Sequence, residues 1–204
     1  MSVTLLIILI TVLVSIAGFQ NSQIIHQALF YPSVMDSRKE YWRFFTHGFI
    51  HADWSHLIFN MLTLYFFGKN CESAFEYLYG NTWMFPLFYL AALLMSSLPS
   101  YAKHKNNYSY RALGASGAVA SVLFYTILLN PWQLLMIQFI IPIPAILFGV
   151  GYIAYSSYQS KNGSGDGIGH EAHLWGAVFG LVFPLATKPE IFPYFINQLL
   201  HPSF

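Results

Sequence analysis

Long apolar stretches separated by polar connections set the pattern of this chain. A helix that crosses a bilayer needs about 20 residues. Runs near that length occur six times, at Val3–Phe19, Trp54–Phe67, Thr82–Leu98, Leu113–Leu129, Pro144–Tyr158 and Ile168–Thr187. We find no internal repeat. The pattern predicts an all-α polytopic membrane protein, a single bundle of six transmembrane helices over residues 1–204.

The connections between these runs differ in character. The first, residues 20–53, is long, and a loop of this length usually has its own structure or a function. The second, residues 69–81, is short and polar. The fourth, residues 130–143, is apolar and contains prolines, so we expect it to lie in the interface or against the bundle. The fifth, residues 159–167, is rich in glycine, which predicts a flexible link.

The composition agrees with a membrane protein. Of the 204 residues, 56% are hydrophobic and only 8% are charged, whereas a soluble domain carries about 25% charged residues. Most of the surface is therefore expected to face membrane lipid. The net charge of +1 argues against a nucleic-acid partner, which would need a basic stripe. The single cysteine excludes an internal disulfide.

Few polar side chains lie inside the predicted helices, and such residues usually mark a function. The second, fourth and sixth helices carry four of them: His56, Asn60, Ser116 and His173. His56 and Asn60 are four residues apart and share one helix face. After His173, Gly176 and Gly180 form a small-residue stripe with Ala177, which lets a neighbouring helix come close.

The positions of these residues along their helices coincide. The second, fourth and sixth helices run in the same direction. His56, Ser116 and His173 lie 13 to 15 residues before the polar ends of their helices, which places each roughly 8–10 Å below the nearer surface of a core about 30 Å thick. Singly, each has a structural explanation, as a packing serine or a hydrogen-bonded bundle histidine. Together, at one depth, they indicate a site.

The chemistry that this site could perform is nucleophilic. A serine becomes a useful nucleophile when a base removes its proton, and histidine suits that task near neutral pH. Ser116 is the candidate nucleophile and His173 the candidate base. No acidic residue lies at the same depth on these helices, so a Ser–His dyad is the simpler interpretation.

Acyl transfer also needs hydrogen-bond donors for the developing oxyanion. His56 and Asn60 can donate from their side chains, and the backbone N–H of Ser116 adds a donor at a helix start. Gly114 and Gly117 on either side would let the backbone of a substrate come close.

With these residues in hand, the sequence resembles the rhomboid family of intramembrane serine proteases, as a bacterial-type six-helix core. The resemblance rests on Gly114-Ala115-Ser116-Gly117, His56 with Asn60, Ala172-His173 with Gly176 and Gly180, and Tyr41-Trp42-Arg43 in the first loop. It implies a serine endopeptidase that needs no cofactor and no metal. It also implies cleavage of single-span transmembrane protein substrates near the membrane surface, in regulated intramembrane proteolysis.

The resemblance also implies roles for single residues. Ser116 would be the nucleophile and His173 the base, with His56 and Asn60 in the oxyanion hole.

Outside the catalytic centre, Trp42 and Arg43 would hold the first loop in the interface, and Glu72 would be a structural carboxylate. The fifth helix and the following loop would act as gate and cap.

One position departs from the family pattern. The aromatic residue that often follows the nucleophile by one turn, and packs on the histidine ring, is Ala120 here. Phe124 or Trp175 would have to substitute.

The resemblance implies an integral multi-pass protein of the bacterial inner membrane, with its active site on the extracytoplasmic side. The distribution of basic residues conflicts with this orientation, because the positive-inside rule favours the cytoplasm for the more basic side. The active-site side carries Arg38, Lys39, Arg43, Lys103, Lys105, Arg111 and Lys161, and the other side Lys69 and Lys188. The rule is weakened here, because Arg43 is expected to be structural and the first loop to be embedded. We therefore expect the outward orientation that the resemblance implies.

Three other classes compete. The first is a metal enzyme. A zinc protease would need His-Glu-x-x-His, but here the histidine after His170-Glu171 is His173, one residue too early. A di-iron enzyme would need paired histidines, and the sequence has none. His47, His51, His104 and His170 are then more simply loop or interface histidines. An inactive relative that binds client helices would typically lack the serine or the histidine. A transporter would place its polar groups near the midplane.

Overall fold

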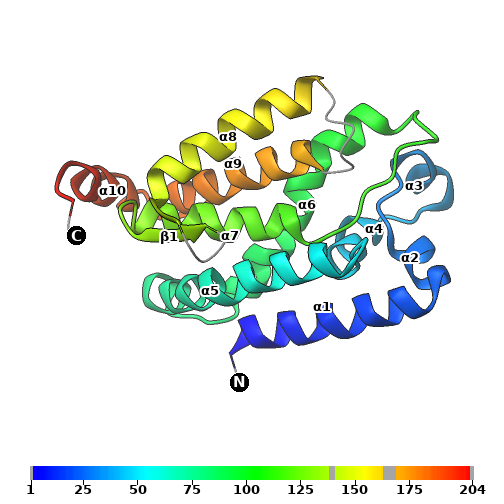
Figure 1. Ribbon diagram of the computed structural model, residues 1–204, viewed down its shortest axis with the longest axis horizontal. Coiled ribbons are helices and arrows are strands. Elements are labelled where there is room, and N and C mark those ends of the chain that lie inside the picture. Colours follow the sequence, from blue (N-terminus) through cyan, green and yellow to red (C-terminus); the bar gives the residue numbers. More distant parts are fainter. Residues whose placement is uncertain (1, 138–140, 163–168, 203–204) are drawn as a thin grey trace.

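The computed structural model describes residues 2–137, 141–162 and 169–202 (Figure 1). The long helices are α1 (Val3–Gln20), α5 (Trp54–Tyr79), α6 (Met84–His104), α7 (Ser116–Leu129), α8 (Ala145–Asn162) and α9 (His170–Thr187). The remaining elements are α2 (Ser22–Ala28), α3 (Pro32–Arg38), α4 (Arg43–Thr46), the 3₁₀ turn η1 (His47–Phe49), β1 (Leu134–Ile137), β2 (Ile141–Pro144) and α10 (Ile191–Leu200).

Each of the six apolar runs forms a helix, but several boundaries differ from the prediction. The second helix does not end at Phe67: α5 continues through the polar residues to Tyr79, where Gly80 ends it in the left-handed conformation. The third helix passes through Pro99 to His104. The fourth begins at Ser116 rather than Leu113, so the candidate nucleophile is the first residue of α7.

The connections hold more structure than the hydrophobic pattern predicts. The first loop contains α2, α3, α4 and η1, which confirms that it has its own structure. The fourth connection forms an antiparallel hairpin in which Leu134 lies opposite Pro144, so the chain is mostly but not purely helical. The apolar C-terminal helix α10 was not predicted. Residues 159–162 of the expected flexible link belong to α8, and the rest of that link lies outside the described residues.

Among the described residues, two helices are long and apolar enough to cross a membrane by length and composition, α1 and α6. Two shorter helices, α7 and α10, are also apolar. The other long helices, α5, α8 and α9, are not among them. The expected set of six transmembrane helices is therefore not given by helix length and composition alone.

Helix α7 occupies the centre of the bundle (Figure 1). It is buried around its whole circumference from Gly117 to Leu128. In Figure 1, α8 and α9 lie on one side of α7, and α5 and α1 on the other. The short helices α2, α3 and α4 gather at the end of the bundle where α7 begins, whereas α10 and the C-terminus lie at the opposite end. The N-terminus lies at the end of α1 that is farther from α2.

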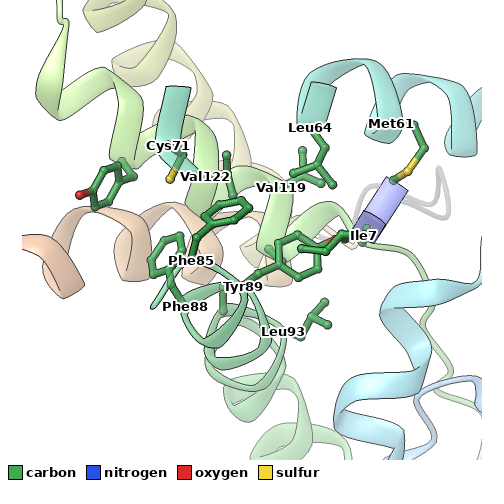
Figure 2. Close-up of a cluster of buried hydrophobic side chains, with 14 of the residues drawn as sticks. Ile7, Met61, Leu64, Cys71, Phe85, Phe88, Tyr89, Leu93, Val119 and Val122 are labelled. Carbon is green, nitrogen blue, oxygen red and sulfur yellow. The ribbon is translucent and has the colours of Figure 1, made fainter. Parts of the chain in front are cut away.

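The largest buried cluster joins four helices (Figure 2). Figure 2 shows Ile7 of α1, Met61 and Leu64 of α5, Phe85, Phe88, Tyr89 and Leu93 of α6, and Val119 and Val122 of α7 pointing into this cluster. Aromatic rings also belong to this cluster: Phe75 of α5 stacks on Tyr125 of α7 with ring centroids 4.8 Å apart. Rings of this size dominate packing energetics, so this cluster fixes how α5, α6 and α7 sit together.

A carboxylate from α5 holds the start of α1. Glu72 accepts hydrogen bonds from the backbone N–H groups of Val3 (2.8 Å) and Thr4 (3.0 Å), and from the hydroxyls of Ser2 (2.6 Å) and Thr4 (2.7 Å). The first amides of a helix lack intrahelical acceptors, and the helix dipole favours an anion there. Glu72 thus acts as an N-cap supplied by another helix.

The first loop is held by a buried arginine. Arg43 pairs with Glu40 at 2.6 Å and donates to the backbone carbonyls of His26 (3.1 Å) and Leu29 (2.7 Å). The guanidinium therefore ties α4 to the end of α2. Its neighbour Trp42 is exposed.

Helices α7 and α9 touch through their backbones. A Cβ atom at Gly176 would lie 2.1 Å from the carbonyl oxygen of Gly117, and one at Gly180 would lie 2.3 Å from that of Ser121. The hydroxyl of Ser121 donates to the carbonyl of Gly176 at 2.7 Å. The matched increments of four residues show that the two helices run in the same direction, as predicted.

This contact predicts that Gly176→Ala severely destabilises the protein, because the added methyl group meets backbone atoms that cannot rotate away. Overpacking of this kind costs roughly 1–3 kcal/mol, and thermal unfolding in detergent would measure it. Gly151→Ala on α8 is the matched control, since nothing lies within 4 Å of a Cβ there. That variant should match or slightly exceed wild-type stability, as expected for Gly→Ala in a helix. Equal unfolding temperatures for the two variants would contradict this account.

Candidate active site

Ser116 lies at the N-terminal end of the central helix α7 and lines a cavity of about 460 Å³. As the first residue of α7, it has a backbone N–H without an intrahelical acceptor, and the positive end of the helix dipole lies there. The cavity is lined by residues of α5, α6, α7, α8, α9 and the loop before α7, including His56, Ser100, Gly114, Ser116, Glu171 and Ala172.

His173 lies on the first turn of α9, beside the start of α7. A Cβ atom at Gly117 would lie 3.4 Å from the carbonyl oxygen of Ala172. One turn further on, Gly176 meets Gly117 directly. The residues adjoining Ser116 and His173 are thus in contact, and both side chains belong to the same end of the bundle. His173 itself is half-buried, and it is not among the described residues that line the cavity.

His56 lies against the loop that precedes the nucleophile. Asp53 caps α5 by accepting a hydrogen bond from the backbone N–H of His56 at 2.8 Å, which sets the position of that first turn. A Cβ atom at Gly114 would lie 2.5 Å from the His56 ring, and Gly114 has a positive φ of 114°. Only glycine fits this conformation and this distance. The structure therefore places His56 in the cavity within reach of Ser116's loop.

The two flanking glycines have a packing role that the sequence did not predict. The His56 ring fills the space beside Gly114, and the hydroxyl of Ser96 on α6 lies 2.3 Å from an added Cβ atom at Gly117. Both glycines therefore allow close packing around Ser116. Their predicted role in letting the backbone of a substrate come close stays a prediction.

Asn60 is buried one turn below His56. Its side-chain amide donates to the backbone carbonyl of His56 at 2.8 Å, which uses one of the two N–H groups that an amide has. Asn60 is absent from the described lining of the cavity. The helix thus places both predicted oxyanion donors on one face, with His56 nearer to the cavity.

A buried histidine that the sequence analysis assigned to the loops or the interface supports the loop before Ser116. His51 is fully buried. Its Nε2 accepts from the backbone N–H of Ala115 at 3.4 Å, and its Nδ1 lies 2.9 Å from the hydroxyl of Ser15 on α1. Ser15 in turn contacts the carbonyl of Phe49 at 3.0 Å. Because Nε2 accepts, Nδ1 must carry the proton and donate to Ser15, which then donates to Phe49.

His47 and His170, which were predicted to be loop or interface histidines, are also buried. The backbone carbonyl of His47 accepts a hydrogen bond from the backbone N–H of Gly114 at 2.9 Å, so His47 holds the loop before Ser116 at a second point. The loop histidines were missed because a short loop sequence gives no signal of burial. Their spacing of four residues was the available clue.

An acidic residue also reaches the cavity. Glu171 accepts from the hydroxyl of Ser100 at 2.6 Å and lies 3.4 Å from the ammonium group of Lys103, both on α6. His104 lies next to it and stacks on Tyr110 with ring centroids 3.8 Å apart. This carboxylate therefore connects the end of α6 to the start of α9 at the rim of the cavity.

Within residues 2–137, 141–162 and 169–202, no three His, Cys, Asp or Glu side chains are grouped so that they could hold one metal ion. The groups at the cavity are instead a serine, histidines and backbone donors at a helix start. Chemically, this set can generate a serine nucleophile and stabilise an oxyanion.

The fold and the site define a helical-bundle protein with a serine at the start of a central helix and a histidine-bearing helix packed against it. Residues 38–189 match the family model of the Rhomboid domain. The chain belongs to the rhomboid family, whose members are integral membrane proteins.

Curated relatives from bacteria and plants agree. The chain is 30% identical to RHOMBOID-like protein 12, mitochondrial, of Arabidopsis thaliana over 156 residues, 67% of this chain and 44% of that protein. It is 23% identical to Rhomboid protease GlpG of Haemophilus influenzae over 184 residues, 89% of this chain and 88% of that protein. It is 26% identical to Rhomboid protease AarA of Providencia stuartii over 167 residues, 72% of this chain and 56% of that protein. The chain therefore spans less than half of the plant relative.

The buried state of His51 predicts a pH-dependent stability. Burial lowers the pKa of His51 from 6.5 to about 3, with His56 adding to the effect and Asp53 opposing it. The unfolded chain binds this proton below pH 6.5 and the folded chain does not, so the free energy of unfolding should fall as the pH falls from 6.5 toward 3. One such group contributes at most about 1.4 kcal/mol per pH unit.

Thermal unfolding in detergent between pH 7 and pH 5 would measure this slope. His51→Gln keeps one donor and one acceptor but cannot be protonated, so it should reduce the slope. His26→Gln, at an exposed histidine of α2, should keep the wild-type slope. If the stability of His51→Gln falls with pH as steeply as that of the wild type, the prediction that buried His51 causes the pH dependence is wrong.

Proposed function

We propose that this chain is an intramembrane serine endopeptidase that cleaves single-span transmembrane protein substrates near the membrane surface, in regulated intramembrane proteolysis. The observation that carries the proposal is the position of Ser116 as the first residue of the buried helix α7, with α9 in backbone contact at Gly117 and Gly176. The names of GlpG and AarA, both called rhomboid proteases, support it.

The length of α7 supports a site below the membrane surface. Its 14 residues span about 21 Å at 1.5 Å per residue, less than the roughly 30 Å of the hydrocarbon core. A helix that begins at Ser116 therefore leaves its first residue several ångströms inside. The non-helical residues Gly114 and Ala115 just before it are fully buried, which is the condition under which irregular backbone is tolerated at membrane depth.

We propose that six helices cross the membrane, namely α1, α5, α6, α7, α8 and α9. An even number of crossings would leave both chain ends on one side of the membrane. The exposed apolar side chains of α1, such as Leu9 and Leu13, would face lipid.

In the proposed mechanism, His173 removes the proton of the Ser116 hydroxyl as its oxygen attacks the scissile carbonyl. The oxyanion forms where the N–H of Ser116, the His56 ring and the Asn60 amide can donate. His173 then gives its proton to the leaving amine, and an acyl enzyme remains on Ser116. Water entering through the cavity hydrolyses this ester, with His173 again as base.

The substrate must also expose its peptide bond. Inside a helix each carbonyl is engaged in a hydrogen bond, so a substrate helix has to unwind locally before Ser116 can attack. Glycine or proline near the cut lowers the cost of unwinding. We therefore propose a preference for helix-weakening residues and for a small residue before the cut.

The catalytic assignment predicts that Ser116→Ala and His173→Ala each abolish cleavage of a single-span test substrate in detergent while the fold is retained. Asn60→Ala should lose less, since removal of one oxyanion donor costs about 10²–10³ in rate. A fluorophosphonate probe should label Ser116 in the wild type but not in His173→Ala. Ser109→Ala, at an exposed serine of the loop before α7, is the control that should label and cleave normally.

Other outcomes would select another class. Normal turnover by Ser116→Ala would refute the serine mechanism, and loss of wild-type activity in a strong chelator would point to a metal enzyme. A folded wild-type chain that neither labels nor cleaves would be an inactive relative.

We propose that the active site faces away from the cytoplasm, in an inner membrane of the bacterial type. Several basic residues on the active-site side are engaged within the protein, which weakens their effect on topology. Arg43 is buried against Glu40, and Lys103 pairs with Glu171. Arg111 lies over the ring of Tyr31 at 4.2 Å.

This orientation predicts that the C-terminus lies in the cytoplasm, so that of two reporters fused after Phe204 only the one that works in the cytoplasm gives a signal. Alkaline phosphatase and green fluorescent protein fusions in a bacterial host would measure it as a pair, since the first is active outside and the second fluoresces inside. An alkaline phosphatase fusion with full activity would reverse the assignment.

A further inference from the structure

The histidine proposed as the base stands next to an aromatic ring from an unexpected helix. The family pattern would supply a ring at the position of Ala120, one turn after Ser116, but alanine is present and only 3% exposed there. The ring of Tyr152, on α8, stacks near the His173 imidazole with centroids 6.0 Å apart and planes 26° apart. Offset aromatic pairs interact at 4.5–7 Å.

The two substitutes suggested by the sequence do not take this place. Trp175 follows His173 by two residues, so it points to another side of α9, and it is 41% exposed. Phe124 is buried on α7, and its ring packs against Tyr152 with centroids 5.5 Å apart. Phe124 thus supports the tyrosine ring that lies on the histidine.

Tyr152 is one of two matched contacts between α8 and α9. One turn further along α8, the ring of Tyr155 meets His170 edge-on at 5.3 Å. His170 lies one turn before His173, and these two rings are 6.0 Å apart. Two pairs with opposite increments show that α8 and α9 run antiparallel, in a register that places Tyr152 at the level of His173.

Few side chains of α8 are fully buried. Among its described residues only Ala145, Gly149 and Ser156 are buried, whereas α7 is buried on all sides. A ring carried by such a helix follows any displacement of that helix. The orientation of His173 therefore depends on where α8 sits.

We propose that Tyr152 is a positioning residue for His173. Its ring, wedged between Phe124 and the imidazole, holds His173 in the orientation that serves Ser116, and thereby couples catalysis to the position of α8. This inference rests on the proposed serine protease function. A misplacement of about 1 Å in a catalytic group can cost on the order of 10² in rate, so the ring can control turnover without contacting a substrate.

The test compares three variants of the full chain in detergent: Tyr152→Leu, Tyr152→Phe and, as the matched control one turn away, Tyr155→Leu. Two quantities are measured, kcat and KM for a single-span test substrate, and the rate of Ser116 labelling by a fluorophosphonate probe. Tyr152→Leu should lower kcat and the labelling rate by about tenfold or more with KM nearly unchanged. Tyr152→Phe keeps the ring and should keep the wild-type kcat, and so should Tyr155→Leu.

Wild-type kcat and labelling in Tyr152→Leu would overturn the proposal, and so would a Tyr152→Phe variant as impaired as Tyr152→Leu, which would assign the effect to the hydroxyl. Thermal unfolding checks that each variant is folded. Should Tyr152→Leu fail to fold, Tyr152→Met fills the space without a ring and is held to the same two outcomes. Failure of the wild type to label at Ser116 would instead remove the proposed function itself.

Discussion

The direct backbone contact between α7 and α9 is the constraint on which the site depends. Without side chains at Gly117, Gly176 and Gly180, the two helices approach until their peptide groups touch, and the Ser121 hydroxyl bridges them. Lipid gives helices no hydrophobic reason to associate, so close packing and interhelical hydrogen bonds must hold them together. The same contact determines that the first turns of both helices meet, which is where Ser116 and His173 lie.

Buried polar groups hold the loop just before Ser116. Gly114 and Ala115 have their backbone N–H groups bound by His47 and His51, and Ser15 of α1 completes the chain. Unpaired buried amides cost about 1–3 kcal/mol each, so these histidines stabilise a loop that would otherwise be expensive at this depth. They also give α1, remote from Ser116 in the sequence, a part in the geometry of the nucleophile.

Two kinds of contact surround the proposed dyad, and they differ in rigidity. The nucleophile side rests on α7, which is buried throughout, and on the His51 chain. The base side rests on α9 and on a ring from α8, a helix with few buried residues. In the proposed site, the oxyanion donors would then stay fixed, while the orientation of His173 would respond to the position of α8.

The hydrophobic pattern by itself determined the number and approximate positions of the six long helices, because apolar runs of membrane length have few other structures. The spacing of His56, Ser116 and His173 from the helix ends predicted that they share one depth, and the motifs determined the family, which the Rhomboid domain match confirms. The catalytic roles of these residues stay predictions.

Tertiary structure decided what depends on contacts between distant segments. The extension of α5 to Tyr79, the start of α7 at Ser116 and the hairpin after it follow from packing and caps that a hydropathy run does not record. His51 contacts Ser15 of α1, 36 residues earlier in the chain, and the ring beside His173 is Tyr152 of α8. Neither neighbour can be read from the local sequence. A sequence shows which residues could act, but only the packed bundle decides which neighbours hold them in place.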